Sequence, residues 1–233
     1  MSDEIILKTT NLHKKYAEGT SMEVHALRGV NIEIKKGEMV AIMGPSGCGK
    51  TTLLNLLGGI DKPTEGTIFI NNQDINQLSD IEVTEFRLHN IGYIFQLFNL
   101  FEFLPALDNT VLPLLLTKTT RLEAEEEAKM MLRQMGLGDK IFHLPNELSG
   151  GEQQRVAVSR ALLMNPAIIL GDEPTGDLDQ DTSTDIMNLF ISINENYNQT
   201  FLVVTHSEHI ASFCHRIIRI VDGEIVDDGK VIK

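Results

Sequence analysis

The residues best suited to chemistry stand in one glycine-rich stretch, residues 44–51, which matches the pattern G-x-x-x-x-G-K-[ST]. Such glycines let the backbone curl so that successive N–H groups point at one anion, and the start of a helix adds its partial positive charge. Lys50 would then reach the β- and γ-phosphates of a nucleotide, while the hydroxyl of Thr51 could bind Mg²⁺. We therefore expect the phosphates to be held by Gly44, Pro45, Ser46, Gly47, Cys48, Gly49, Lys50, Thr51 and Thr52.

A pair of acidic residues, Asp172 and Glu173, follows an apolar run at residues 167–170. Asp172 is placed to bind Mg²⁺ directly or through water, and Glu173 is placed to polarise a water molecule for in-line attack on the γ-phosphate. His206 follows another apolar run, residues 200–205. Because the carboxyl ends of parallel strands share one edge of a sheet, we expect these side chains and the phosphate loop to form one site.

Strands and helices must position these groups. Residues 39–43, directly before the glycine-rich stretch, read as a buried strand, and residues 52–57 read as a helix. This strand, turn and helix start is the context that the phosphate-binding pattern requires. Strands and helices alternate after residue 150, which predicts a mostly parallel sheet.

Other segments predict a second sheet and a helical region. A capping box from Thr120 to Glu123 starts a helix, and from about residue 91 to residue 148 the pattern is helical. Residues 222–223 form a two-residue turn between two final strands. Short strands that predict a small antiparallel sheet lie at residues 5–9, 30–34 and 67–70.

The composition is that of a globular protein, with 42% hydrophobic and 23% charged residues. A net charge of −13 argues against a non-specific nucleic-acid binder, which needs a basic face. Two cysteines form no disulfide framework, so we expect a reducing compartment. No run reaches the roughly 20 apolar residues that span a bilayer, so we expect any membrane role to come through another subunit.

Residues 148–155, Leu-Ser-Gly-Gly-Glu-Gln-Gln-Arg, resemble the signature motif of ABC-type ATPases, which distinguishes that family from other phosphate-loop proteins. The other family marks stand in order along essentially the whole chain: Tyr16, the phosphate loop, Gln96, the signature, residues 168–173, residues 176–179 and His206. Within the family the chain is similar to ATP-binding subunits of the lipoprotein-releasing, macrolide-export and cell-division branch. That narrower match rests on residues 58–66, 95–100 and 172–176.

The resemblance implies a homodimer with two ATP molecules sandwiched between the protomers. In it Ser149, Gly150 and Gly151 of one protomer face the γ-phosphate that the other protomer's loop holds, and Asp179 passes between protomers. The physical pattern agrees, because Ser149 and the glycines precede a helix and offer a second anion site. A two-fold dimer gives each ATP one site from each chain.

The resemblance also implies roles for single residues. Tyr16 resembles the aromatic residue that stacks on adenine, and His206 the residue that contacts the γ-phosphate. Gln96 resembles the glutamine that links Mg²⁺ to the membrane-subunit interface, so the expected metal ligands are Thr51, Gln96 and Asp172. The expected catalytic residues are Glu173, His206, Gln96 and Lys50.

The fold that the resemblance implies is α/β: a P-loop NTPase (RecA-like) core with a mostly parallel sheet, an antiparallel β-subdomain and an inserted α-helical subdomain. We expect one ABC ATPase domain over residues 1–233. Its core and antiparallel β-subdomain would occupy residues 1–90, the helical subdomain with the signature residues 91–160, and the remainder of the core residues 161–233.

The implied function is ATP binding and hydrolysis that drives a separate transmembrane permease, with export or a lipoprotein-, peptide- or macrolide-type cargo. The subunit would lie peripherally on the cytoplasmic face of the membrane. One alternative is an ABC ATPase that couples ATP to signalling or envelope remodelling without transport. Another is a soluble ABC ATPase of DNA repair or translation.

Four aromatic residues have two interpretations. They form part of the core of the helical lobe, or they line a groove for the permease: Phe95, Phe98, Phe101 and Phe103.

Overall fold

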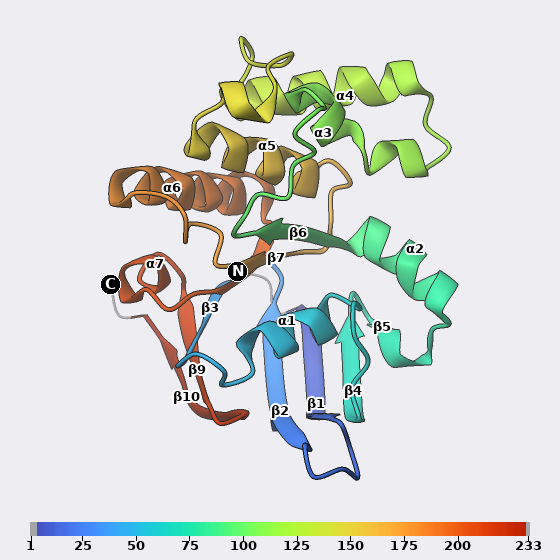
Figure 1. Ribbon diagram of the computed structural model, residues 1–233, viewed down its shortest axis with the longest axis vertical. Coiled ribbons are helices and arrows are strands. Elements are labelled where there is room, and N and C mark those ends of the chain that lie inside the picture. Colours follow the sequence, from blue (N-terminus) through green and yellow to red (C-terminus); the bar gives the residue numbers. More distant parts are fainter. Residues whose placement is uncertain (1–3, 232–233) are drawn as a thin grey trace.

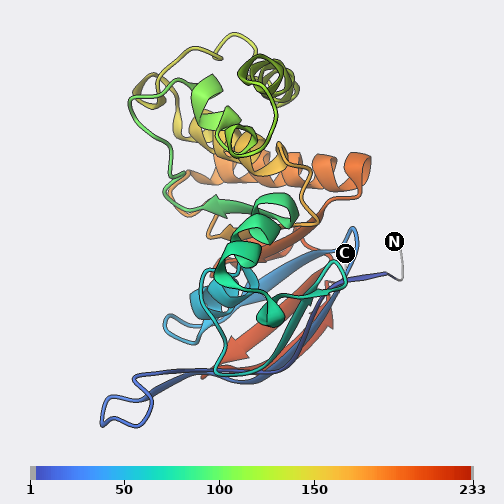
Figure 2. The ribbon, with the colours of Figure 1, turned by 90° about the vertical axis from the view of Figure 1, so that its right-hand side faces the viewer.

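Two β-sheets organise the protein, whose computed structural model describes residues 4–231 (Figure 1). Within those residues the first sheet is antiparallel, with strand order β2-β1-β4-β5. Figure 2 shows the hairpin that joins β1 and β2 projecting from the body of the protein. These two strands have 12 residues each and extend well beyond the predicted ones. The strands are β1 (Ile5–Tyr16), β2 (Val24–Lys35), β4 (Glu65–Ile70) and β5 (Gln73–Asp74).

The second sheet carries the order β10-β9-β3-β8-β7-β6 over the same described residues. Its neighbouring strands are parallel except for the final hairpin of β9 and β10. Asp222 and Gly223 form the predicted two-residue turn of that hairpin, with φ of 48° and 81°. The strands are β3 (Met39–Met43), β6 (Ile91–Phe95), β7 (Ile168–Asp172), β8 (Thr200–Val204), β9 (Arg216–Val221) and β10 (Glu224–Lys230).

Helices lie between the two sheets and on the outer face of the parallel sheet (Figure 1). In the part of the chain that the structure describes, none of them is both long and apolar enough to span a bilayer. Short 3₁₀ turns occupy Ile75–Gln77, Leu114–Leu116 and Pro145–Glu147. The α-helices are α1 (Lys50–Leu57), α2 (Asp80–Asn90), α3 (Ala106–Val111), α4 (Arg121–Gln134), α5 (Gly150–Leu162), α6 (Gln180–Tyr197) and α7 (Glu208–Ala211).

Strand β3 shows how the layers are held together, because it is buried on both faces. Val40 and Ile42 belong to the core cluster that contains the leucines of α1 and the inner face of the antiparallel sheet. Met39, Ala41 and Met43 point the other way, into a cluster with α6 and α7. Alternate side chains of an extended strand face opposite sides, so one apolar strand joins both clusters.

A third cluster belongs to the helices between β6 and β7. The buried face of α4 consists of Ala124, Ala128 and Leu132, which pack with residues of α3 and α5. The predicted capping box of α4 is present. The Thr120 side chain accepts a hydrogen bond from the backbone N–H of Glu123, and the Glu123 carboxylate accepts one from the backbone N–H of Thr120. Figure 1 shows this helical unit stacked beyond α6, at the end of the molecule opposite the antiparallel sheet.

The predicted fold class is confirmed, with a mostly parallel sheet, an antiparallel sheet and helices inserted between strands. The helical pattern predicted from residue 91 is wrong at its start, because Ile91–Phe95 forms strand β6 and pairs with β7. Its β-branched and aromatic residues run into further apolar residues, which hid the strand. The subdomain boundaries at residues 90 and 160 stay predictions, and the ends of the predicted 1–233 domain lie outside the described residues.

Candidate functional site

The phosphate loop leads from the carboxyl end of β3 directly into α1. Gly49 is the N-cap of α1, with φ of 105°, and Gly47 has φ of 79°. Both values lie in the left-handed region that glycine adopts at little cost. The Lys50 ammonium donates to the carbonyl oxygens of Gly44 and Pro45, each at 2.8 Å, so its side chain folds back across the loop. The loop therefore presents backbone N–H groups, a helix start and an ammonium to one space.

The two left-handed glycines provide a test of how tightly the loop is built. A Cβ at position 49 would lie 2.4 Å from the carbonyl oxygen of Ala26, whereas one at position 47 would meet nothing within 4 Å. Gly47→Ala should therefore cost only the backbone penalty, about 1–2 kcal/mol of unfolding free energy. Gly49→Ala should cost more than about 3 kcal/mol, because the neighbouring backbone must also move. Urea unfolding of the nucleotide-free variants measures both, and equal losses would contradict the packing argument.

A cavity of about 420 Å³ opens beside the loop. Tyr16, at the end of β1, lines it and is 39% exposed. The cavity joins the loop to residues of β2 and of the β9–β10 turn, which the sequence alone did not mark because they come from separate strands. Its lining consists of Tyr16, Val24, His25, Ala26, Arg28, Gly47, Gly49, Lys50, Thr51, Thr52, Asp222 and Gly223.

The structure brings the two acids and the histidine together at the carboxyl edge of the parallel sheet. Asp172 is the last residue of β7 and lies opposite Val204 of β8. The next residue, Glu173, has φ of 48°, and its backbone N–H donates to the Val204 carbonyl at 3.0 Å. His206 Nδ1 lies 2.8 Å from Glu173 Oε1, with the imidazole largely exposed. The Glu173 carboxylate is thus held in place by a partner that faces solvent.

Asp172 has an unusual electrostatic environment. Partial burial raises the pKa of its carboxyl group, and the neighbouring charge of Glu173 raises the pKa further. The Lys50 ammonium acts in the opposite direction and lowers that pKa. The charges of Lys50 and Asp172 therefore interact, and this interaction links the phosphate loop to the end of β7.

Gln96 directly follows β6 and meets the loop after β7. Its Nε2 donates to Asp177 Oδ1 at 2.8 Å. Because a carboxylate only accepts hydrogen bonds, this contact fixes the amide and leaves the Gln96 carbonyl oxygen free to act as a ligand. Thr51, Gln96 and Asp172 together offer hydroxyl, amide and carboxylate oxygens, the hard donors that Mg²⁺ prefers. The donor set therefore fits the expected metal.

The signature residues lie at a different helix start from the phosphate loop. Ser149 is exposed and is the N-cap of α5. Its hydroxyl accepts a hydrogen bond from the backbone N–H of Glu152, and the Glu152 carboxylate accepts one from the backbone N–H of Ser149. Gly150 and Gly151 form the first turn of α5. Among the described residues that line the nucleotide-sized cavity, these three are absent. This helix start, whose cap Ser149 is exposed, is thus separate from that cavity.

Asp179 is the exposed N-cap of α6, and its carboxylate accepts from the backbone and hydroxyl of Thr182 at 2.9 and 2.6 Å. These hydrogen bonds hold the pKa of Asp179 below its ordinary value. Asp179 is therefore a fixed negative charge at the protein surface. It lies on the same loop as Asp177, the partner of Gln96.

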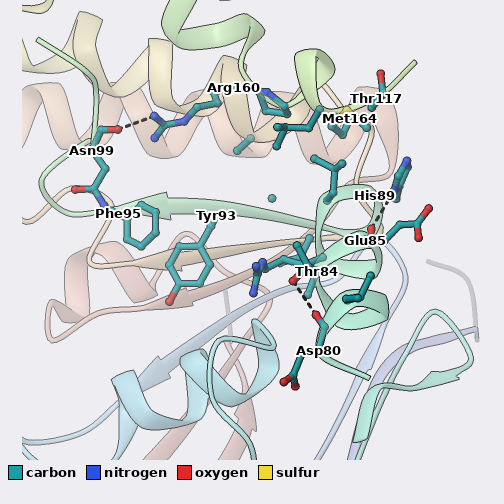
Figure 3. A pocket seen from close by; sticks show the side chains of 18 of the residues that line it. Asp80, Thr84, Glu85, His89, Tyr93, Phe95, Asn99, Thr117, Arg160 and Met164 are labelled. Atoms are coloured by element: carbon teal, nitrogen blue, oxygen red, sulfur yellow. Dashed lines mark hydrogen bonds between the residues drawn. The ribbon is translucent and has the colours of Figure 1, made fainter. Parts of the chain in front are cut away.

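A larger groove of about 1190 Å³ lies between α2, β6 and α5 (Figure 3). Tyr93 and Phe95 point into it from β6, and Arg160 borders it while donating to the carbonyl oxygen of Asn99 at 2.6 Å. Leu116 also lines the groove and is 75% exposed.

The four aromatic residues of this region do not share one environment. Phe95 lines the groove, whereas Phe101 and Phe103 are exposed elsewhere and pack edge to face. Phe98 is half-buried, and a Cβ at Gly150 would lie 3.8 Å from its ring. Of the four, Phe95 is therefore the one that lines this groove, and its contact with a permease stays a prediction. Neither Phe101 nor Phe103 supports the reading as core, because both are exposed.

Comparison with known proteins gives a consistent result. The family model described as ABC transporter matches residues 27–176. An uncharacterized ABC transporter ATP-binding protein of Methanocaldococcus jannaschii, MJ0796, is 46% identical over 230 residues, covering 97% of each chain. The lipoprotein-releasing system ATP-binding protein LolD of Geobacter metallireducens is 40% identical over 223 residues, covering 96% of this chain and 99% of that protein.

Among solved structures, a dimeric post-hydrolysis state of the MJ0796 cassette, bound to ADP and Pi, is similar to this fold. The TM-score is 0.87 at 44% sequence identity, and the match covers 97% of this chain and 99% of that one. The likeness therefore extends over the sheets, the helical unit and the segments that carry the site.

Proposed function

The chain belongs to the ABC transporter family as an ATP-binding and ATP-hydrolysing subunit. We propose that two copies form a dimer that binds two ATP molecules between its protomers and thereby drives a transmembrane permease. The observation that carries this is the meeting of the phosphate loop, Asp172, Glu173 and His206 at one edge of the parallel sheet. A site that contains both a phosphate-binding loop and a fixed carboxylate beside it is suited to hydrolysis of the phosphate and not only to its binding.

We assign the chemistry to residues as follows. Glu173 accepts a proton from the attacking water, and His206 keeps the Glu173 carboxylate in position while its exposed ring reaches toward the γ-phosphate. Lys50 would leave the carbonyl oxygens of its own loop to bind phosphate oxygens. When bound by Thr51, Gln96 and Asp172, Mg²⁺ would neutralise charge on the β- and γ-phosphates.

The open helix start at Ser149 supports the dimer. It offers N–H groups to an anion, yet it does not line the cavity that contains Lys50. A second protomer related by a two-fold axis would bring its own phosphate loop to that helix. Loss of the γ-phosphate then removes the contact that joins the protomers, so hydrolysis opens the dimer.

We place the permease contact in the groove between α2, β6 and α5, because Gln96 follows the strand that lines it. The subunit would then sit on the cytoplasmic face of the membrane, held by its partner. The LolD relative bears the name of a lipoprotein-releasing system, and we propose export of a lipoprotein-, peptide- or macrolide-type cargo for this chain.

Purified chain tests the ATPase proposal directly. Phosphate release should depend on both ATP and Mg²⁺, and light scattering should show dimers only when ATP is present and hydrolysis is slowed. Phosphate release that persists in EDTA would contradict the metal assignment. A monomer at every ATP concentration would contradict the dimer.

Leu116→Asp tests the groove. A carboxylate placed in an apolar contact must be desolvated, which costs several kcal/mol when no partner pairs with it. We expect the affinity-tagged variant, expressed in its native cells, to retain at least about tenfold less of the co-purifying polypeptide that has membrane spans. Met22→Asp is the matched control, because Met22 is 79% exposed on the β1–β2 hairpin and does not line the groove. Equal recovery with both variants would exclude the groove as the permease contact.

A further inference from the structure

The aromatic ring at the end of β1 is tied to a loop that starts beyond α1. The Tyr16 hydroxyl donates to Asp61 Oδ2 at 2.9 Å. The other oxygen of the same carboxylate, Oδ1, accepts from Lys14 Nζ at 2.7 Å and from the backbone N–H of Lys62 at 2.7 Å. Lys14 Nζ also donates to the Lys62 carbonyl at 2.7 Å. Both oxygens of Asp61 are therefore engaged, one of them by the tyrosine.

Lys14 also contacts the ring itself. Its ammonium lies 4.9 Å from the centroid of the Tyr16 ring, within the range of a cation–π contact. Its side chain is only 12% exposed. Among the described residues that line the cavity, Tyr16 is present whereas Lys14 and Asp61 are absent. The cavity therefore contacts Tyr16 but neither Lys14 nor Asp61, the two residues that hold it.

The carboxylate is suited to a permanent contact. Burial alone raises the pKa of Asp61, but hydrogen bonds from Lys14, the Lys62 backbone and Tyr16 outweigh burial and hold the pKa below its ordinary value. Asp61 is thus ionised at neutral pH, and charge-assisted hydrogen bonds are about twice as strong as neutral ones. The contact fixes the ring before any ligand arrives.

The same loop connects the ring to the phosphate site. Helix α1 begins at Lys50 and ends at Leu57, four residues before Asp61. Helix α1 therefore carries the phosphate-binding lysine at its start, and the loop that follows its end carries the carboxylate that binds the Tyr16 hydroxyl.

We propose that Lys14 and Asp61 form a clamp that fixes the ring of Tyr16 in the orientation that stacks on the base of the bound nucleotide. Both are positioning residues for the adenine moiety, and the proposal rests on the nucleotide function proposed above. A ring that is already immobilised loses little side-chain entropy on stacking, so the clamp contributes to the affinity for the base alone.

The test compares ATP with inorganic tripolyphosphate, which lacks the base and the sugar. Tyr16→Phe keeps the ring but removes the hydroxyl that donates to Asp61. Because both variants keep a ring or its position in part and lose only the clamp, we expect Tyr16→Phe and Asp61→Ala each to weaken ATP binding about three- to tenfold. Tripolyphosphate affinity, measured by competition against a fluorescent nucleotide, should change less than about twofold.

A mutant cycle separates clamping from a general structural role. In a Tyr16→Ala background Asp61→Ala should have no further effect on ATP affinity, because there is no ring left to hold. Lys8→Met is the matched control, since Lys8 lies on the same strand and pairs with Glu33 at 2.6 Å away from the cavity. It should leave both affinities unchanged.

The outcomes are distinct. Unchanged ATP affinity in Tyr16→Phe and Asp61→Ala, or a parallel loss for both ligands, would overturn the clamp. If Asp61→Ala does not fold, Tyr16→Phe and Lys14→Met decide the question, since both keep the Asp61 carboxylate and its contact with the Lys62 backbone. Failure of the unmodified chain to bind either ligand would instead overturn the proposed function.

Discussion

Glu173→Gln is expected to lower ATP turnover by roughly 10²–10⁴ while leaving ATP binding intact. The amide has the shape of the carboxylate, can occupy the same backbone conformation and can still accept a hydrogen bond from His206. It cannot, however, accept a proton from water. The variant should therefore accumulate as an ATP-bound dimer, which light scattering detects, while phosphate release measures the loss of turnover.

Glu208→Gln is the control for charge in the same region. Glu208 lies two residues after His206, but its carboxylate pairs with Arg219 at 2.9 Å rather than with the histidine. Its turnover should stay within about twofold of the unmodified chain, because exposed ion pairs contribute little. Normal turnover in Glu173→Gln would remove Glu173 from the mechanism.

Ser149→Arg should abolish ATP-driven dimerisation, with a loss of more than about a hundredfold in dimer affinity. Ser149 is the exposed N-cap of α5, and a long arginine side chain there would fill the space that the proposed dimer gives to the neighbour's γ-phosphate. The cavity beside Lys50 lies elsewhere in the same chain, so the monomer should still bind ATP. The measurement is light scattering in the Glu173→Gln background, where ATP is not consumed.

Loss of a helix cap could by itself disturb the protein, at a cost of about 1 kcal/mol. Thr120→Arg controls for this effect, because Thr120 caps α4 through the same kind of capping box within the helical unit. It should destabilise the chain to a similar degree and leave dimerisation intact. ATP-driven dimers of Ser149→Arg would contradict the sandwich arrangement.

Much of the site could be predicted because its signals are local. The phosphate loop is a continuous pattern, Glu173 directly follows one apolar strand, and His206 lies two residues after another. One general rule then suffices to bring them together, since carboxyl ends of parallel strands share an edge. The pairing of β7 with β8 and the contact between the two side chains agree with that rule.

Other features depend on contacts between distant segments and left no local signal. The hydrogen bond from Tyr16 to Asp61 joins residues 45 positions apart, and no periodicity indicates it. Helix α2 was missed because none of its described side chains is fully buried, which weakens the apolar periodicity. A sign was nevertheless present, because Ser79 and Glu82 form a capping box at its start.

The hydrogen bond between Gln96 and Asp177 has a consequence for communication across the molecule. On one side it touches the strand whose Phe95 borders the groove, and on the other it holds the loop that leads to Asp179 and α6. A shift of one segment relative to the other must strain or break this hydrogen bond. Linkage is reciprocal, so a partner that binds the groove more tightly in the closed dimer than in the open one must favour closure of the dimer by the same factor.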